Sequence, residues 1–339
     1  MSEPIQPGLG PLAWQQQRWQ QLLEQGQQQR LPHALLLAGP RGCGKRQFAA
    51  AFAGYWLCAQ PTAQGACGKC QSCHLLTIGS HPDFCFPQTS GKSETLRVDE
   101  IREVVEFCSK TAQLGGHRLV LLQPACSMNR NAQNALLKTL EEPGEGTLLL
   151  LVADHPQLLL PTIKSRCQQQ FFSPPEREQA LAWLAQEGLD GATAEAALAA
   201  AAGAPLRAVQ IAHSDWFQAR GDWVQQLLAL ADGRGSLAAV AQQLGRYSQH
   251  ELLEALCHWS HQSLRAGFLR LPLTDPAMQG FVALARRIGA RALLLWHERL
   301  EAASGRLARS ANLNKELQLD ELLWQLTPEG VASNLARSS

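Results

Sequence analysis

One segment of the chain has residue types that could bind a phosphate. Residues 39–45 read G-P-R-G-C-G-K and fit the G-x-x-x-x-G-K pattern of a P-loop. In such a loop glycines let backbone N–H groups close around phosphate oxygens, and the lysine reaches the terminal phosphates. The apolar residues 35–37 predict a buried strand before the motif, and residues 47–52 predict a helix after it. The candidate ATP-binding residues are Gly39, Gly42, Gly44 and Lys45.

Two positions differ from a P-loop that hydrolyses ATP. A hydrolytic site has Ser or Thr after the lysine to hold Mg²⁺, whereas this chain has Arg46. In a P-loop ATPase, the strand that corresponds to the second predicted strand, residues 119–122, ends in an acidic residue that holds Mg²⁺ and orients water. Here Gln123 and Pro124 follow it. Two independent losses argue against hydrolysis, and nucleotide binding without hydrolysis stays open.

Four cysteines predict a metal site. Cys67, Cys70 and Cys73 form C-x₂-C-x₂-C, and Cys58 lies nine residues upstream. Four thiolates suit tetrahedral Zn²⁺, and such a closed site is structural because no position is left for a substrate. An iron–sulfur cluster is the alternative, since some cluster motifs begin with the same spacing, but the following C-P is missing. Four free cysteines are the remaining possibility.

Composition limits the class of protein. The chain has 339 residues, enough for two or three domains; 45% are hydrophobic and 17% charged, as in a folded globular protein. A net charge of +1 gives no indication of nucleic acid binding. We expect no signal peptide in residues 1–17 and no membrane span. Ten cysteines in such a chain then indicate a reducing compartment, so we expect a cytoplasmic protein.

The order of elements predicts an α/β fold followed by helices. Residues 84–87 and 147–152 predict further strands, and helices are predicted to begin near Val98 and to cover residues 129–142. Strands that alternate with helices give a parallel sheet. From about Trp216 onward the apolar spacing is helical throughout.

Several motifs together carry a family resemblance. They are residues 31–37 before the P-loop, the four-cysteine insert, the run N-A-L-L-K-T-L-E-E-P at 134–143, and S-R-C at 165–167. The chain resembles a bacterial clamp-loader subunit, and the order and spacing are similar to the delta-prime family of DNA polymerase III. The resemblance covers essentially the whole chain, and residues 312–317 are similar to the family's last collar helix.

The resemblance implies an AAA+ architecture and a role in replication. It implies a P-loop α/β domain in residues 1–168 that includes the zinc module at 58–73, a small helical lid in 169–213, and a helical collar in 214–339. It further implies a hetero-pentameric ring with tau/gamma and delta subunits that loads the sliding clamp on primed DNA. The chain would be a rigid stator without ATPase activity of its own, within the DNA-directed DNA polymerase (nucleotidyltransferase) holoenzyme.

The resemblance also assigns roles to single residues. Arg166 would be an arginine finger that points at ATP bound to the neighbouring subunit. The sensor position in the third predicted strand falls at Ala153, a further loss, and Arg207 is one residue away from the second-sensor position, so it is given no role. Two other functions compete with the stator: an active ATPase motor, and a zinc-knuckle nucleic-acid binder. The second is disfavoured because Lys69 is the only basic residue in residues 58–73.

Overall fold

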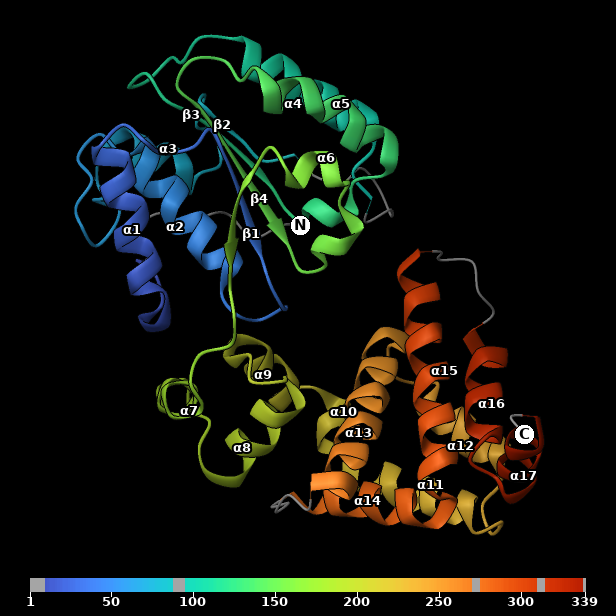
Figure 1. Ribbon diagram of the computed structural model, residues 1–339. Coiled ribbons are helices and arrows are strands. Elements are labelled where there is room, and N and C mark those ends of the chain that lie inside the picture. Colours follow the sequence, from blue (N-terminus) through green and yellow to red (C-terminus); the bar gives the residue numbers. More distant parts are fainter. Residues whose placement is uncertain (1–9, 88–94, 270–274, 310–314, 338–339) are drawn as a thin grey trace. The chain divides into compact units, whose positions relative to one another are not determined.

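The chain folds into two compact units. The structure is a computed structural model that describes residues 10–87, 95–269, 275–309 and 315–337 (Figure 1). The units are Met1–Gln179 and Ala180–Ser339. The finer division at residues 168 and 213 stays a prediction, and residues 312–314 of the predicted collar motif lie outside the described residues. Among the described residues no helix is both long and apolar enough to cross a membrane.

A five-stranded parallel sheet forms the centre of the first unit. The strand order is β2-β3-β4-β1-β5. The strands are β1 (Ala34–Ala38), β2 (Phe84–Cys85), β3 (Arg118–Leu122), β4 (Thr147–Ala153) and β5 (Gln168–Phe171). In the central pair Ala34 lies opposite Leu149 and Ala38 opposite Ala153. This register brings the residues after β1 and β4 to the same edge of the sheet.

The strand predictions are confirmed at the centre of the sheet, whereas at its edges one predicted strand is shorter than expected and one strand was not predicted. All residues of β1, β3 and β4 are buried. A strand that is buried on both faces is a nearly continuous apolar run, so these three strands could be predicted from the sequence. The strand predicted at 84–87 is only two residues long. β5 was not predicted, because three glutamines carry no apolar pattern. It is an edge strand that pairs with β1 and is largely exposed.

Helices cover both faces of this sheet (Figure 1). The first unit contains α1 (Gln16–Gln27), α2 (Lys45–Leu57), α3 (Gln71–Thr77), α4 (Val98–Ser109), α5 (Arg130–Glu141) and α6 (Pro161–Lys164), with short 3₁₀ turns Ala13–Gln15, Ala125–Ser127 and Pro156–Leu158. α4 and α5 pack on one face, where Ile101 and Leu136 join the core formed by Leu36 and Leu151. On the other face Trp19 of α1 contacts Phe48 and Phe52 of α2 edge-on, with ring centroids 5.7 Å apart in both pairs.

Local signals set the bounds of α5, the helix predicted over residues 129–142. Asn129 is its N-cap, and the side-chain Oδ1 accepts a hydrogen bond from the backbone N–H of Ala132 at 2.9 Å. The helix ends at Glu141, two residues before Pro143, because proline cannot continue a helix. α5 therefore begins and ends within one residue of the prediction.

The second unit is helical, as predicted. α7 (Arg177–Gln186) spans the boundary, and the following helices are α8 (Gly191–Ala200), α9 (Pro205–Ala212), α10 (Asp215–Gln218), α11 (Arg220–Ala231), α12 (Leu237–Leu244), α13 (Gln249–Leu269), α14 (Pro276–Ile288), α15 (Ala290–Arg309), α16 (Lys315–Trp324) and α17 (Pro328–Arg337). Trp216, Trp223 and Trp259 pack edge-on or tilted against one another at the centre of this unit, and the ring of Phe281 packs at a tilt against Trp259. The aromatic and leucine stripes of these helices thus form core.

A buried ion pair joins the loop before β2 to β3. Asp83 is fully buried and Arg118 is 1% exposed, and Oδ1 of Asp83 lies 3.6 Å from Nε of Arg118. The same carboxylate accepts hydrogen bonds from the backbone N–H groups of Gln113 (2.8 Å) and Leu114 (2.6 Å). A buried charge that loses its partner is costly, so this pair is essential to the edge of the sheet.

We predict that Asp83→Asn lowers the free energy of unfolding by about 3–5 kcal/mol, because the buried charge of Arg118 would lose its anionic partner and keep only the carbonyl and ring of Phe107. Urea denaturation of the full chain measures this change. Asp99→Asn is the matched control: Asp99 pairs with Arg102 on the exposed surface of α4, and its loss should cost less than about 1 kcal/mol. Equal stability of the Asp83 variant and the wild type would contradict a structural role for the buried pair.

Candidate functional site

The predicted P-loop lies between β1 and α2 at the carboxyl edge of the sheet. Gly39, Gly42 and Gly44 have φ angles of +144°, +86° and +86°, which glycine adopts without strain. The N–H of Gly39 donates to the carbonyl of Ala153 at 3.3 Å, which fixes the start of the loop against the end of β4. The loop thus has the backbone form that its sequence predicts.

Lys45 is turned inward at the start of α2, with only 3% of its side chain exposed. Its Nζ donates hydrogen bonds to the carbonyl oxygens of Gly39 and Pro40, both at 2.7 Å. Its third partner is the carboxylate of Asp154, whose Oδ1 lies 2.6 Å from Nζ. The lysine that the sequence predicts as a phosphate ligand contacts acceptors of the chain itself.

Asp154 is a residue of this site that the sequence analysis missed. It follows β4 directly, next to Ala153, the position assigned to a lost sensor. A signal was available, because residues that follow neighbouring parallel strands meet at the carboxyl edge of the sheet. At β3 the expectation holds in the structure: this strand ends at Leu122, and Gln123 follows in place of a carboxylate. Arg46 is the exposed second residue of α2.

A second missed residue, Gln15, packs against the P-loop from the amino-terminal segment. Its side chain is fully buried, and Nε2 donates to the carbonyls of Cys43 (3.1 Å) and Gly44 (3.0 Å). Its Oε1 accepts from the N–H of Leu12 at 3.0 Å. No sequence signal distinguished Gln15 from the other glutamines in this segment, since only the tertiary fold brings it to the loop.

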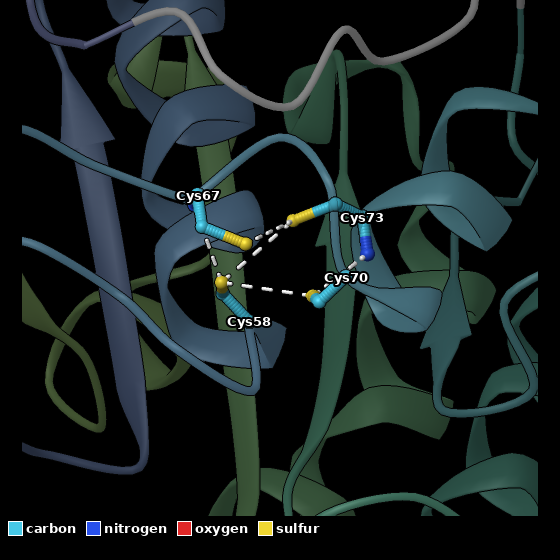
Figure 2. Close-up of side chains that lie close together, drawn as sticks. All are labelled: Cys58, Cys67, Cys70 and Cys73. Atoms are coloured by element: carbon cyan, nitrogen blue, oxygen red, sulfur yellow. Dashed lines mark hydrogen bonds between the residues drawn. The ribbon is translucent and has the colours of Figure 1, made fainter.

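The four predicted metal ligands do converge (Figure 2). The sulfurs of Cys58, Cys67, Cys70 and Cys73 all lie within 4.8 Å of one another. Three Sγ–Sγ distances are 3.7, 3.8 and 4.0 Å, for Cys73–Cys58, Cys58–Cys70 and Cys67–Cys73. Sulfurs about 2.3 Å from one tetrahedral ion lie about 3.8 Å apart, so the spacing fits a single ion. A polynuclear cluster places several atoms between its thiolates and would hold them farther apart.

Hydrogen bonds favour a thiolate at Cys70, one of the four sulfurs of this site. The N–H of Cys67 donates to Sγ of Cys58 at 3.3 Å, and the N–H of Cys73 donates to Sγ of Cys70 at 3.5 Å. Burial opposes ionisation of Cys70, but hydrogen bonds from Cys73 and Ala59 outweigh it and lower the pKa of this thiol to about 6. Burial, with hydrogen bonding to Cys70, raises the pKa of Cys73. The donors favour ionised sulfur at Cys70, as metal binding requires.

A buried hydrogen-bond chain attaches this cysteine module to the sheet. Ser72, between two of the ligands, donates to the carbonyl of Leu57, and its Oγ lies 2.7 Å from Nε2 of His81. The N–H of Asp83 donates to Nδ1 of His81 at 3.1 Å. Burial lowers the pKa of His81, although Asp83 opposes this shift, so the neutral imidazole accepts at Nδ1 and donates at Nε2. The module is thereby tied to the buried Asp83–Arg118 pair.

Arg166 lies in the turn between α6 and β5, and its side chain is 34% exposed. Its guanidinium contacts Glu141 at the end of α5: Nε donates to Oε1 at 2.8 Å, and the second terminal nitrogen lies 2.5 Å from the same oxygen. The other terminal nitrogen donates to the carbonyl of Thr162 at 3.0 Å. The arginine is therefore held in a defined orientation at the surface of the first unit.

Comparisons with known proteins agree with these features. The family model for "DNA polymerase III, delta subunit" matches residues 14–176. The delta-prime subunit of DNA polymerase III from Pseudomonas aeruginosa is 38% identical over 92% of this chain and 96% of its own length. The Escherichia coli delta-prime subunit is 32% identical over 92% of this chain and 94% of its length. This chain belongs to the delta-prime family of DNA polymerase III.

The fold of this delta-prime chain agrees with the AAA+ architecture that the resemblance implied. It has a P-loop domain with a parallel sheet and a cysteine insert, followed by helices. Among solved structures, a DNA polymerase III gamma subunit-related protein from Thermotoga maritima aligns over 92% of this chain and 98% of its own, with 17% identity and a TM-score of 0.45. Membership of the family places the chain among the subunits of DNA polymerase III.

In this delta-prime chain α5 supports the segment that carries Arg166 at a second point. Gln133 is 4% exposed, and its Nε2 donates to the carbonyl of Leu158 at 3.3 Å. Its Oε1 accepts from the N–H of Leu160 at 2.7 Å. The sequence analysis did not single out Gln133, which lies in α5 one residue before the N-A-L-L-K-T-L-E-E-P run, with no local sign of a special role. Arg207, which was given no role, is 7% exposed and pairs with Glu254 at 2.5 Å inside the second unit.

We predict that the delta-prime chain binds one metal ion at the four cysteines, and that Cys70→Ser removes it because one thiolate of the tetrahedral set is lost. Elemental analysis of the purified full chain measures metal per protein. Cys126→Ser is the matched control, since Cys126 lies outside the cluster and should leave the metal content unchanged. Equal metal content in the Cys70 variant and the wild type would contradict the site.

Proposed function

We propose that this chain is the non-hydrolysing stator of a clamp loader. The observation that carries this proposal is the composition of the P-loop site. Gln123 follows β3 where a motor subunit needs a carboxylate, and Arg46 follows Lys45 where a motor needs a hydroxyl for Mg²⁺. Asp154 does supply a carboxylate nearby, but it is paired with Lys45. The chain therefore lacks the Mg²⁺ ligands of a motor, while it keeps the P-loop fold.

The proposed chemical contribution of the stator is Arg166. Arginine is permanently charged and presents a planar set of donors that suits phosphate oxygens. In the loader, Arg166 would act as an arginine finger on ATP bound to the neighbouring tau/gamma subunit, where it stabilises the charge that develops on the transferred phosphoryl group. Its partial exposure and its support from Glu141 favour this role over that of an unconstrained surface residue.

The proposed assembly follows the family. The chain would lie in a hetero-pentameric ring with tau/gamma and delta subunits, and the ring would load the sliding clamp on primed DNA during replication in the cytoplasm. It would be a component of the DNA-directed DNA polymerase holoenzyme with no nucleotidyl transfer of its own. Family membership supports this assembly.

We propose that the ion held by the four cysteines is zinc. Zn²⁺ prefers four-coordinate thiolate sites, and the Sγ spacing fits its bond length. Cys58, Cys67, Cys70 and Cys73 would fill all four positions, so the ion supplies no open site for a substrate. It would brace the insert between α2 and β2.

The decisive experiment compares ATP turnover of the reconstituted clamp loader that contains wild-type chain or Arg166→Ala. We expect the variant complex to assemble and to lose turnover at the adjacent ATP site by about 10³-fold or more, because the developing phosphoryl charge would lose its cationic partner. Arg102→Ala is the matched control, since Arg102 forms only an exposed pair with Asp99 on α4. Single-turnover hydrolysis resolves the affected site from the others.

Two outcomes would contradict the proposal separately. Normal turnover by the Arg166 variant would show that this residue does not act in trans. ATP hydrolysis by the isolated chain that is lost in Lys45→Met would show that the chain is a motor, the alternative function, in spite of Arg46 and Gln123.

A further inference from the structure

The lysine in the interior of the P-loop has no hydrogen-bonding capacity left. A lysine ammonium has three N–H donors and no more. Nζ of Lys45 has three acceptors: Gly39 O (2.7 Å), Pro40 O (2.7 Å) and Oδ1 of Asp154 (2.6 Å). With 3% of its side chain exposed, Lys45 can reach a phosphate only after it gives up one of these contacts.

The pairing of β1 with β4 places Asp154 beside the P-loop. It follows β4, whose last residue Ala153 lies opposite Ala38 in the β1–β4 ladder. The carbonyl of Ala153 also accepts the hydrogen bond from the N–H of Gly39. The carboxylate, which is 31% exposed, is thus placed beside Lys45 by the residue that directly follows a buried central strand.

Two of the three loop glycines, Gly39 and Gly44, are also accounted for by contacts within the chain. A Cβ on Gly39 would meet the carbonyl oxygen of Phe172 at 2.1 Å. A Cβ on Gly44 would meet Nε2 of Gln15 at 2.4 Å and Cδ1 of Leu12 at 2.6 Å. Phe172, which follows β5, leaves no room for a side chain at Gly39, and Gln15 and Leu12 of the amino-terminal segment leave none at Gly44. A phosphate is not required to explain them.

We propose that Asp154 is a built-in counter-ion for Lys45 that stands in for the nucleotide phosphate and excludes nucleotide from the P-loop. A phosphate that approaches Lys45 must break an ion pair whose lysine is buried and whose carboxylate is 31% exposed, and it must place its negative charge beside the Asp154 carboxylate, which opposes binding. The loop then serves as a structural turn that ties β1, β4 and α2 together. This inference deepens the proposed function and rests on it, because the exclusion of nucleotide has a role in the loader only if the chain is the non-hydrolysing stator.

The first experiment measures ATP binding to the full chain by isothermal titration calorimetry, with and without Mg²⁺. We expect no saturable binding by the wild type, with a Kd weaker than about 1 mM. We expect Asp154→Asn to bind at least about tenfold more tightly, because the neutral amide leaves the charge of Lys45 available. Glu145→Gln is the matched control: this exposed acid precedes β4 as Asp154 follows it, and its variant should behave as wild type.

A stability cycle tests the same pair without nucleotide, and it also shows whether each variant folds. Lys45→Met and Asp154→Asn should each lower Tm by about 5 °C or more, and the double variant should lower it by less than the sum of the two. Additive shifts would overturn the proposal, because they would mean that the two side chains do not depend on each other.

Two binding results would overturn it as well. Saturable ATP binding by the wild type that Lys45→Met removes would show that Asp154 does not exclude nucleotide. A folded Asp154→Asn variant that binds no more tightly than wild type would show that something else does. Neither result bears on Arg166, since turnover of the Arg166→Ala loader is measured on the neighbouring subunit; the two proposals therefore fail independently.

Discussion

The parallel pairing of β1 with β4 is the constraint on which the functional region depends. It brings Gly39 and Asp154 side by side at the carboxyl edge, and the buried backbone on either side prevents a shift of register. β5 pairs with the other side of β1, so the carbonyl of Phe172 closes on Gly39. A nucleotide-type loop is thus locked between two strands, and its lysine is satisfied from within.

α5 links that sheet to the surface where the proposed finger lies. Leu136 and Leu140 pack in the core, so the helix cannot rotate without exposing apolar surface. From this fixed helix Gln133 binds the backbone after β4, and Glu141 holds the guanidinium of Arg166. His33, just before β1, also contacts the carbonyl of Leu140 at 2.8 Å. The Arg166 turn is therefore positioned by the same core that fixes the P-loop, which suits a rigid subunit.

The sequence alone determined the central strands, the helices that pack on them, the cysteine module and the family. Each of these has a local cause: continuous apolar runs where a strand is buried on both faces, a capping residue and a proline at the ends of α5, and C-x₂-C spacing that brings thiolates together within a short loop. The missing Mg²⁺ ligands at Arg46 and Gln123 could be recognised for a similar reason, because each position lies at a fixed offset from a recognisable motif.

Only the tertiary structure decided which side chains of the chain itself contact the P-loop. Asp154 lies more than a hundred residues from Lys45 in sequence, and Gln15 is one glutamine among many, so their contacts arise solely from strand pairing and helix packing. β5 escaped prediction because an exposed edge strand is selected by its neighbour β1 and not by its own apolar pattern. The ion pair between Arg166 and Glu141 likewise joins two segments that no local spacing in the sequence connects. Local chemistry thus specified which groups are present, and long-range packing specified which of them meet.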